Sequence, residues 1–532
     1  MTISLYDNLQ ISNKIGQCNH SKILFSSAND LSNENTLQSA KRNRIVHSSS
    51  PFSHAQSPFE SRFSAACPAA RHPRARRGLS YHRACRSLRL GHADVPAERI
   101  PGAGSEQDIE PAGASERSEW KFYGKVVRVS PKKVAFKDMT AIKEILITQD
   151  LPKNEALVRN FRLDPTYGDL LTATDRAWHK ALRRVLSRAF SIVSLNELEE
   201  AMSECILELV DKLKQECNRG SAVVNIHEYL KRLSVDIIAD AAFGETLHFV
   251  RDETHPLPEQ LQKDLVLWAL YALMPWLKYV PFVPGKMHPS VSKFTNDTIQ
   301  KRKNGKRRND LLQKLIDAQE NPEDPLTDFD VFLQMGLFLQ AGSDTSSNTL
   351  VFCVVELVRN PSVCAQLVSE IRDAFPSRDT LPSHTTLKEL PYLNAVLNET
   401  LRMHMQSGQG IPRITQEDVV LGGFAVPKGT EIVASISQMA RDPAIWPNPE
   451  TFRPERFLEE NVPMDAFMPF GAGSRNCIGK NFAYMSMRLT LGILLYHFDL
   501  ELVPDQKVET QLFITYQIKG GKYLVKITPR QW

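Results

Sequence analysis

The pattern of hydrophobic and polar positions becomes regular only from about Trp120. Apolar and polar residues alternate over 124–136, on either side of Ser130-Pro131, and this alternation predicts two short strands. The next stretch, 140–147, has helical spacing. The first regular part of the chain therefore predicts a small hairpin followed by a helix.

Long amphipathic stretches then dominate to about Phe375. Short strands and loops follow Glu399, including the segment 422–435, and helical spacing returns after Cys477. This pattern is typical of a mainly α protein with small β-sheets, which belongs to the α+β class.

The longest helical pattern covers residues 324–359, with Asp324 as a capping residue type and Pro325 at its start. At about 1.5 Å per residue, such a helix crosses most of a domain. Its middle, 341–346, reads Ala-Gly-Ser-Asp-Thr-Ser, although Gly there costs about 1 kcal/mol relative to Ala. Ser and Thr also compete for backbone hydrogen bonds. Either a kink with a packing role or a functional groove explains this composition.

The most apolar stretch is too short to cross a bilayer. It covers residues 265–277, is broken by Pro275 and is followed by Lys278, whereas a span needs about 18 apolar residues. The stretch is either an ordinary core helix or an element that lies at a membrane surface.

Residues 1–118 have a different composition. They are rich in Ser, Asn, Arg and Pro, with an arginine cluster between Arg71 and Arg89. Such a segment buries too little apolar surface to order itself, so we expect disorder. A transit peptide and a miscalled reading frame in place of a membrane anchor are the alternatives.

The 532 residues are 42% hydrophobic, which is ample for a large domain. The formal net charge of +4 is too small to indicate a nucleic acid partner. The eight cysteines show no metal-ligand spacing and no framework of a short disulfide-rich chain, which predicts reduced thiols. They are Cys18, Cys67, Cys85, Cys205, Cys217, Cys353, Cys364 and Cys477.

One of these cysteines, Cys477, lies in a glycine-rich loop, residues 470–479, just before the last helix. A cysteine thiolate in an apolar pocket can ligate haem iron if backbone N–H groups surround the sulfur. Gly471 and Gly473 allow the loop to curl, because glycine adopts positive φ cheaply. Gly479 leaves room for a flat ligand. The alternative is a structural cysteine in a glycine-rich turn.

The loop matches the haem-ligand signature of the cytochrome P450 family, which the chain resembles over about residues 120–532. The resemblance implies a P450 domain over 119–532, with haem b between the long central helix and the helix behind the cysteine loop. It assigns Cys477 as the iron ligand. In the same loop, Arg475 would contact a propionate and Phe470 would shield the sulfur.

The 341–346 segment matches the acid-threonine motif of the family. Thr345 would hydrogen-bond to the Ala341 carbonyl, open a groove for dioxygen and, with Asp344, deliver protons. Phe338, Ala341 and Ile411 would line the substrate pocket.

The resemblance also implies a structural frame. Glu399, Arg402 and Arg456 would form a buried charge triad that supports the cysteine loop and takes no part in catalysis.

Further basic residues would bind the propionates. These are Arg183 and Arg413, with His179 at the position where the family has tryptophan. The segment 405–410 departs from the usual proline pair of the family, which favours a distinctive substrate.

These observations predict a haem-thiolate monooxygenase of fungal type that inserts one oxygen atom from O2 into a small or medium apolar substrate, as a tailoring step in secondary metabolism. NADPH-cytochrome P450 reductase would supply the electrons. We expect the enzyme at the cytosolic face of the endoplasmic reticulum membrane, with peripheral contact through 265–284. The alternatives are an isomerase or dehydratase with the same fold that does not use O2, and a non-catalytic haem binder from a damaged gene.

Overall fold

The computed structural model describes residues 124–531, except 165–166, 221, 253–256, 281–286, 322–325, 378–379, 409 and 513. The predicted disorder of residues 1–118 falls on residues outside this range. All statements below concern the described residues, within the unit Val95–Trp532.

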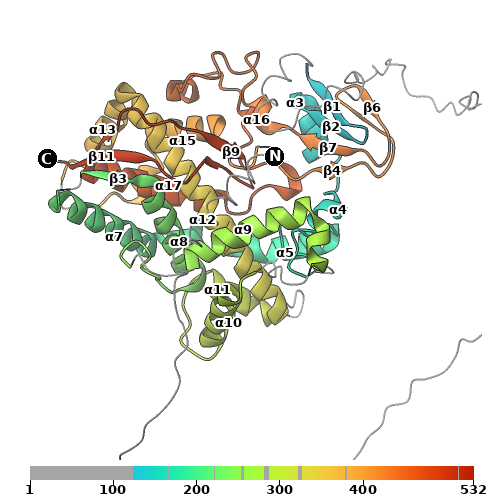
Figure 1. The fold of residues 1–532 in the computed structure, drawn as a ribbon, viewed down its shortest axis with the longest axis horizontal. Coiled ribbons are helices and arrows are strands. Elements are labelled where there is room, and N and C mark those ends of the chain that lie inside the picture. The colour runs from blue at the N-terminus through green and yellow to red at the C-terminus, as the bar shows by residue number, and fades with distance from the viewer. Residues whose placement is uncertain are drawn as a thin grey trace, which may run out of the picture. The chain divides into compact units, whose positions relative to one another are not determined.

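Helices make up most of this unit (Figure 1). The longer ones are α5 (Arg176–Ala189), α7 (Glu199–Asn218), α8 (Ile226–Phe243), α9 (Leu257–Leu273), α10 (Pro289–Lys303), α11 (Leu311–Gln319), α12 (Asp328–Arg359), α13 (Pro361–Ala374), α15 (Pro391–Met403) and α17 (Lys480–His497). The shorter ones are α3 (Met139–Lys143), η1 (Glu144–Thr148), α4 (Glu155–Val158), α6 (Ile192–Asn196), η2 (Pro275–Tyr279), α14 (His384–Leu387), α16 (Ile436–Met439), η3 (Pro454–Leu458), η4 (Met464–Ala466) and η5 (Gly473–Arg475).

The strands form four small sheets. The largest has the order β1-β2-β7-β4, with β2 and β7 parallel and the other pairs antiparallel. Its strands are β1 (Val126–Ser130), β2 (Lys133–Phe136), β7 (Glu431–Ala434) and β4 (Arg413–Ile414). The others are β3-β11-β8 (Val223–Asn225, Leu524–Pro529, Phe498–Leu502), β5-β6 (Val419–Leu421, Phe424–Val426) and β9-β10 (Thr510–Leu512, Tyr516–Ile518).

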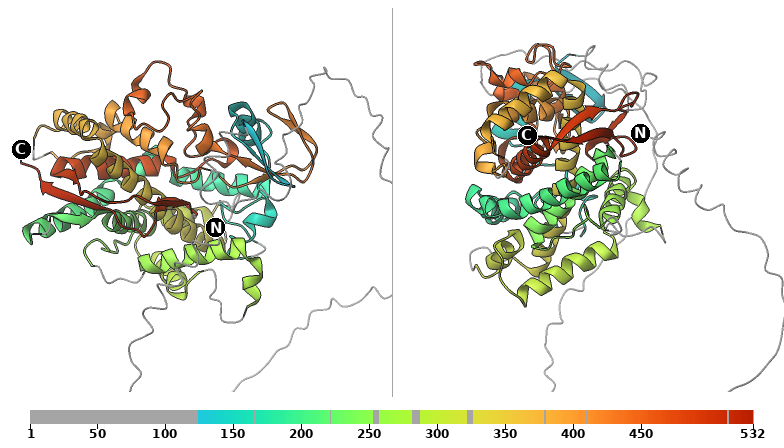
Figure 2. Two further views of the ribbon diagram at one scale, coloured as in Figure 1. Left: turned by 45° about the horizontal axis from the view of Figure 1, so that its top comes forward. Right: turned by 90° about the vertical axis from the view of Figure 1, so that its left-hand side faces the viewer.

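Two large hydrophobic clusters form most of the core. The larger one joins the helices around α12, and the smaller one lies under the sheet that contains β1, β2 and β7. Figures 1 and 2 show α12 passing through the helical region, with this sheet set to one side. The α8 and α12 helices pack closely, because a Cβ on Gly342 would lie only 2.9 Å from Ile238 Cδ1. The predicted mainly α fold with small sheets is confirmed.

The predicted hairpin is confirmed as β1 and β2, but the helix predicted over 140–147 is only partly correct. It is α-helical to Lys143 and continues as the π-helix η1. The Gln149 N–H donates to the Glu144 carbonyl at 2.9 Å, five residues back, instead of to the carbonyl four residues back. Hydrophobic spacing does not distinguish these two bonding patterns.

The predicted start of the long helix is wrong by four residues. The Thr327 side chain caps α12 by accepting from Asp330 N, and the Asp330 carboxylate accepts from Thr327 N in return. This capping box satisfies the N–H groups of Thr327 and Asp330, and the helix begins at Asp328. Asp324 itself lies outside the described residues.

No single helix among the described residues is long and apolar enough to cross a membrane. The 265–277 stretch divides into two parts, since α9 ends at Leu273 and η2 starts at Pro275. Trp268 and Tyr271 of α9 are buried, whereas Trp276 and Tyr279 of η2 are 58% and 77% exposed.

Candidate active site

The loop before α17 is tightly curled around Cys477. Cys477 N donates to the Phe470 carbonyl at 2.8 Å, and Gly471 N donates to the Met468 carbonyl at 2.9 Å. Gly471 and Gly473 have φ of 71° and 72°, which side chains rarely adopt. A Cβ on Gly473 would lie 1.9 Å from the Leu146 carbonyl oxygen of η1. The loop therefore rests directly on η1, and glycine is required at this contact.

The Cys477 thiol is accessible to solvent and yet strongly desolvated. A side chain has both properties, solvent access and desolvation, when it is recessed among protein atoms but open on one side. Burial raises the pKa of the Cys477 thiol, whereas the Gly479 N–H and the Arg183 guanidinium act to lower it. A bound metal cation would outweigh burial and deprotonate the sulfur.

No neighbouring atom in the described part of the chain requires glycine at position 479. The nearest atom to a Cβ at this position is Cys477 Sγ, at an ordinary distance of 3.9 Å. The space beside the sulfur is therefore free of protein side chains, as a flat ligand over the cysteine would require.

Four basic side chains and the imidazole of His179 lie together beside the loop, and we call them the cationic cluster. Its members lower one another's pKa, which shows that they are close together: Lys153, His179, Arg183, Arg413 and Arg475. Burial, followed by Arg475 and Arg413, lowers the pKa of Lys153 to about 7. Burial and Arg475 lower the pKa of His179 to about 3.

The direct partners of this cluster are neutral. Lys153 donates to the Leu171 carbonyl, Arg475 to the Ala173 carbonyl, and Arg413 Nη1 to the Leu151 carbonyl at 3.0 Å. Arg413 Nε is buried without a hydrogen-bond partner among the described residues. Lys153 and Arg413 are buried, and Asp150 is the carboxylate that acts most strongly on Arg413 and Arg475, so further anions would stabilise the cluster. Two carboxylates of a ligand held at Cys477, such as the propionates of haem, fit this requirement.

Arg183 contacts the cysteine loop itself. Its Nη1 donates to the Asn476 carbonyl at 2.7 Å, and its Nη2 donates to the Asn476 side chain. Arg183 therefore fixes α5 against the loop.

Sequence patterns did not identify Lys153 as part of this cluster. It lies in no motif, and the fold brings it there through an isolated β-bridge with Arg413, more than two hundred residues later. The segment around it, 149–155, reads Gln-Asp-Leu-Pro-Lys-Asn-Glu and carries no signal of this role.

The middle of α12 has one open face. Almost every residue from Asp330 to Val358 is buried, whereas Ala341 is exposed and Thr345 is half-buried. Thr345 Oγ1 donates to the Ala341 carbonyl at 2.8 Å, which is the predicted bond. Gly342, by contrast, serves the close packing on α8. The 341–346 segment thus combines a packing residue with an open polar face.

Asp344 points away from that face, toward α8. Lys231 Nζ lies 3.8 Å from Asp344 Oδ1, and the two side chains are 20% and 11% exposed. Burial raises the pKa of the Asp344 carboxyl, and Lys231 opposes the rise. The carboxyl is therefore buried next to Thr345, with one ammonium group in contact.

The predicted pocket residues differ in their accessibility. Phe338 is only 5% exposed and packs edge-on against Phe190, with ring centroids 5.2 Å apart. Ile411 is half-buried and lies two residues before Arg413. Ala341 has the most accessible position of the three.

Glu399, Arg402 and Arg456 form one buried cluster. Glu399 accepts from Arg402 Nε at 2.7 Å and from Arg402 Nη2 at 2.8 Å. Its Oε1 also accepts from Arg456 Nε at 2.9 Å. The remaining N–H groups of the two guanidinium groups donate to backbone carbonyls, including that of Ala440. All the side chains are at most 3% exposed, so every charge is satisfied without water.

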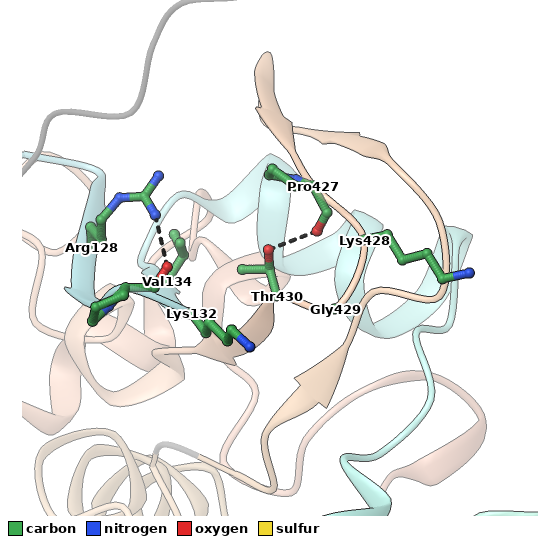
Figure 3. Close-up of a pocket in the computed structure, with 8 residues that line it drawn as sticks. Arg128, Lys132, Val134, Pro427, Lys428, Gly429 and Thr430 are labelled. Carbon is green, nitrogen blue, oxygen red and sulfur yellow. Dashed lines mark hydrogen bonds between the residues drawn. The ribbon is translucent and has the colours of Figure 1, made fainter. Parts of the chain in front are cut away.

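A surface hollow also lies at the edge of the largest sheet, lined by residues of β1, β2 and the β6–β7 turn (Figure 3). Arg128 and Lys132 belong to its rim, and Thr430 donates to the Pro427 carbonyl beside it. None of the predicted site residues lines this hollow.

The cysteine loop, the cationic cluster and the open face of α12 are features that a haem with a thiolate ligand would need. Comparison with known proteins agrees, because the cytochrome P450 family model matches residues 118–525. The chain belongs to the cytochrome P450 family, and it is an oxidoreductase of the haem-thiolate monooxygenase class.

Its relatives include fungal enzymes. Cytochrome P450 monooxygenase acrD of Aspergillus aculeatus is 36% identical over 423 residues, which cover 77% of this chain and 84% of that protein. Cytochrome P450 monooxygenase LUC2 of Fusarium sp is 35% identical over 428 residues, with coverages of 78% and 83%. Cytochrome P450 monooxygenase mpsF of Macrophomina phaseolina is 31% identical over 411 residues, with coverages of 75% and 100%.

Proposed function

We propose that Cys477 ligates the haem iron and that the enzyme oxygenates a small or medium apolar substrate as a tailoring step in fungal secondary metabolism. The observation that carries the assignment is the Cys477 sulfur, recessed, open on one side, and next to the N–H of Gly479 and to Arg183. The fungal monooxygenases among the relatives support the tailoring step.

The spectrum of the reduced carbon monoxide complex tests this proposal. We expect purified holoenzyme to show the absorbance maximum typical of thiolate-ligated haem. A preparation that retains no haem, or one with the spectrum of a histidine-ligated haem, would refute the assignment of Cys477.

The propionates would lie against the cationic cluster. Arg183, Arg413 and Arg475 donate to carboxylates readily, and His179 and Lys153 complete the set. Two negative charges would raise the depressed pKa of Lys153, so that this lysine holds its proton when haem is bound.

The haem supplies the iron at which dioxygen is activated; the chain supplies orientation and protons. Thr345 Oγ1 donates its own proton to the Ala341 carbonyl, which leaves the lone pairs of its oxygen facing the open side. Asp344 is the preceding residue, and burial raises the pKa of its carboxyl, so it would serve as a proton relay toward Thr345 from its position against α8. Lys231 connects this carboxyl with the surface between α8 and α12.

Replacing Thr345 with alanine tests this role. We expect hydrogen peroxide released per NADPH to rise and product per NADPH to fall by roughly tenfold, since a positioned group in a proton transfer contributes at least that much. The measurement requires a substrate found by product analysis. Thr349→Ala is the control, because Thr349 makes the same type of bond, to the Thr345 carbonyl at 2.8 Å, but is buried. Equal coupling in wild type and Thr345→Ala would contradict the role.

Electrons would come from NADPH-cytochrome P450 reductase on the cysteine side of the haem. Lys480 is exposed directly after the loop, and Lys180 and Arg188 are exposed on α5, which Arg183 joins to the loop. Exposed basic residues near the loop, such as Lys480, would suit an acidic partner domain.

The enzyme would lie on the cytosolic face of the endoplasmic reticulum membrane, with contact through 265–284. The exposed Trp276 and Tyr279 of η2 support this placement, because such rings favour the lipid–water interface. The buried Trp268 and Tyr271 restrict the contact to the part after α9.

A further inference from the structure

Three near-parallel rings lie together beyond the acid-threonine segment of α12. The His404 ring is 4.4 Å from the Phe352 ring, with an interplanar angle of 2°. The Tyr516 ring is 5.1 Å from Phe352 at 16° and 6.1 Å from His404 at 18°. The rings come from α12, from the residue after α15 and from β10, so the stack joins three distant segments.

A contact between His404 and Glu356 fixes the middle of this arrangement. His404 Nε2 lies 2.7 Å from Glu356 Oε1, with 12% and 11% of the side chains exposed. Glu356 follows Phe352 by one helical turn, so the two residues share a face of α12. The imidazole is thus held through its plane by Phe352 and at its edge by Glu356. We name these four residues, Phe352, Glu356, His404 and Tyr516, the His404 clamp.

Backbone bonds extend the clamp to two loops. The Gln406 side chain donates to the His404 carbonyl at 3.0 Å, and Tyr516 N donates to the Gln406 carbonyl at 3.1 Å. The start of the 405–411 segment and the end of the β9–β10 turn are therefore tied together. The placement of both loops therefore depends on the position of His404.

These loops meet the open face of α12. Asn348 Nδ2 lies 3.5 Å from Thr515 Oγ1, in the β9–β10 turn. Asn348 follows Thr345 by three residues and is on the same side of the helix. Ile411, at the other end of the first loop, precedes Arg413 of the cationic cluster. The β9–β10 turn thus contacts α12 three residues from Thr345, and the 405–411 segment is tied to β10 through Gln406.

We propose that His404 is a positioning residue that sets how far the 405–411 segment and the β9–β10 turn stand from Thr345, and thereby controls which ligands fit over the haem. The proposal rests on the proposed site at Cys477 and Thr345. Core packing alone does not explain a histidine at position 404. A leucine would fill the same space but would leave Glu356 without this partner.

Two substitutions of His404 separate the parts of the clamp in the holoenzyme. His404→Phe keeps a ring for the stack and loses the contact with Glu356, whereas His404→Gln keeps a donor for Glu356 and loses the ring. Glu356→Gln removes the charge from the other side and serves if a His404 variant does not fold. The matched control is His248→Gln, because His248 pairs with Glu208 at the same 2.7 Å but in another part of the fold.

Hydrogen exchange and ligand binding provide the two measurements. In the clamp variants we expect residues 404–412 and 510–518 to exchange about tenfold faster, while α8 is unchanged. The affinity of the haem for 4-phenylimidazole should change by about fivefold or more, and that for the smaller imidazole by less than about twofold. The control variant should change neither the two segments nor the azole affinities.

Three results would overturn the proposal. One is unchanged exchange in both segments. Another is faster exchange throughout the protein, which would make His404 a packing residue only. The third is faster local exchange with unchanged 4-phenylimidazole affinity. Failure of the proposed haem ligation is recognised separately, because it removes the thiolate spectrum of the wild type and leaves the exchange comparison intact.

Discussion

Replacing Cys477 with serine removes the carbon monoxide band of thiolate-ligated haem and reduces oxygenation below detection. Serine is almost isosteric with cysteine, so the loop bonds from Cys477 N and Gly471 N are retained. What disappears is a soft, anionic sulfur ligand that donates electron density to iron. The hydroxyl of serine stays protonated near neutral pH and is a poor substitute. The effect is therefore electronic, with the fold preserved.

The measurements are the reduced carbon monoxide difference spectrum, haem content and far-ultraviolet circular dichroism. Cys217→Ser is the control, because Cys217 is a half-buried thiol whose Sγ lies near the Ile527 carbonyl at 3.8 Å, outside the site. It should keep the band. A Cys477→Ser protein that still shows the thiolate band would assign the ligand to another cysteine.

Replacing Glu399 with glutamine destabilises the holoenzyme by about 3–5 kcal/mol, because two buried guanidinium groups lose their only carboxylate. Arg402 and Arg456 are 0% and 3% exposed, so water cannot replace it. Glu399 Oε1 also accepts from Arg453 N at 3.0 Å, so the substitution disturbs the chain before η3 as well. Urea unfolding followed by haem absorbance measures the change.

The surface pair Lys526–Glu501 offers a comparison, since its atoms are 2.9 Å apart and the side chains are 47% and 54% exposed. Glu501→Gln should change the free energy of unfolding by at most about 1 kcal/mol. If Glu399→Gln has an effect as small as that of Glu501→Gln, the triad does not support the fold.

Local chemistry made part of this molecule predictable from sequence. The hairpin of β1 and β2 follows from alternation around Ser130-Pro131, and α17 follows from helical spacing after the glycine-rich loop. The bond from Thr345 to the Ala341 carbonyl follows from spacing along one helix. In each case, residues close in sequence determine the geometry.

Contacts between distant segments were not predictable in this way. Lys153 joins the cationic cluster only because it pairs with Arg413 in space, and Lys231 meets Asp344 only because α8 packs on α12. The start of α12 was missed for another reason. Asp324 and Thr327 are both capping residue types, and only the bonds with Asp330 decide between them.

The contact between Gly473 and the Leu146 carbonyl has a consequence for biosynthesis. The two residues are about 330 positions apart, so the loop that carries Cys477 can settle only after nearly the whole chain has left the ribosome. Until then, η1 and the neighbouring cations remain without the loop that covers them. Haem incorporation is therefore a late event, and nascent chains that stop before residue 479 are expected to emerge without the cofactor, however well their helices have formed.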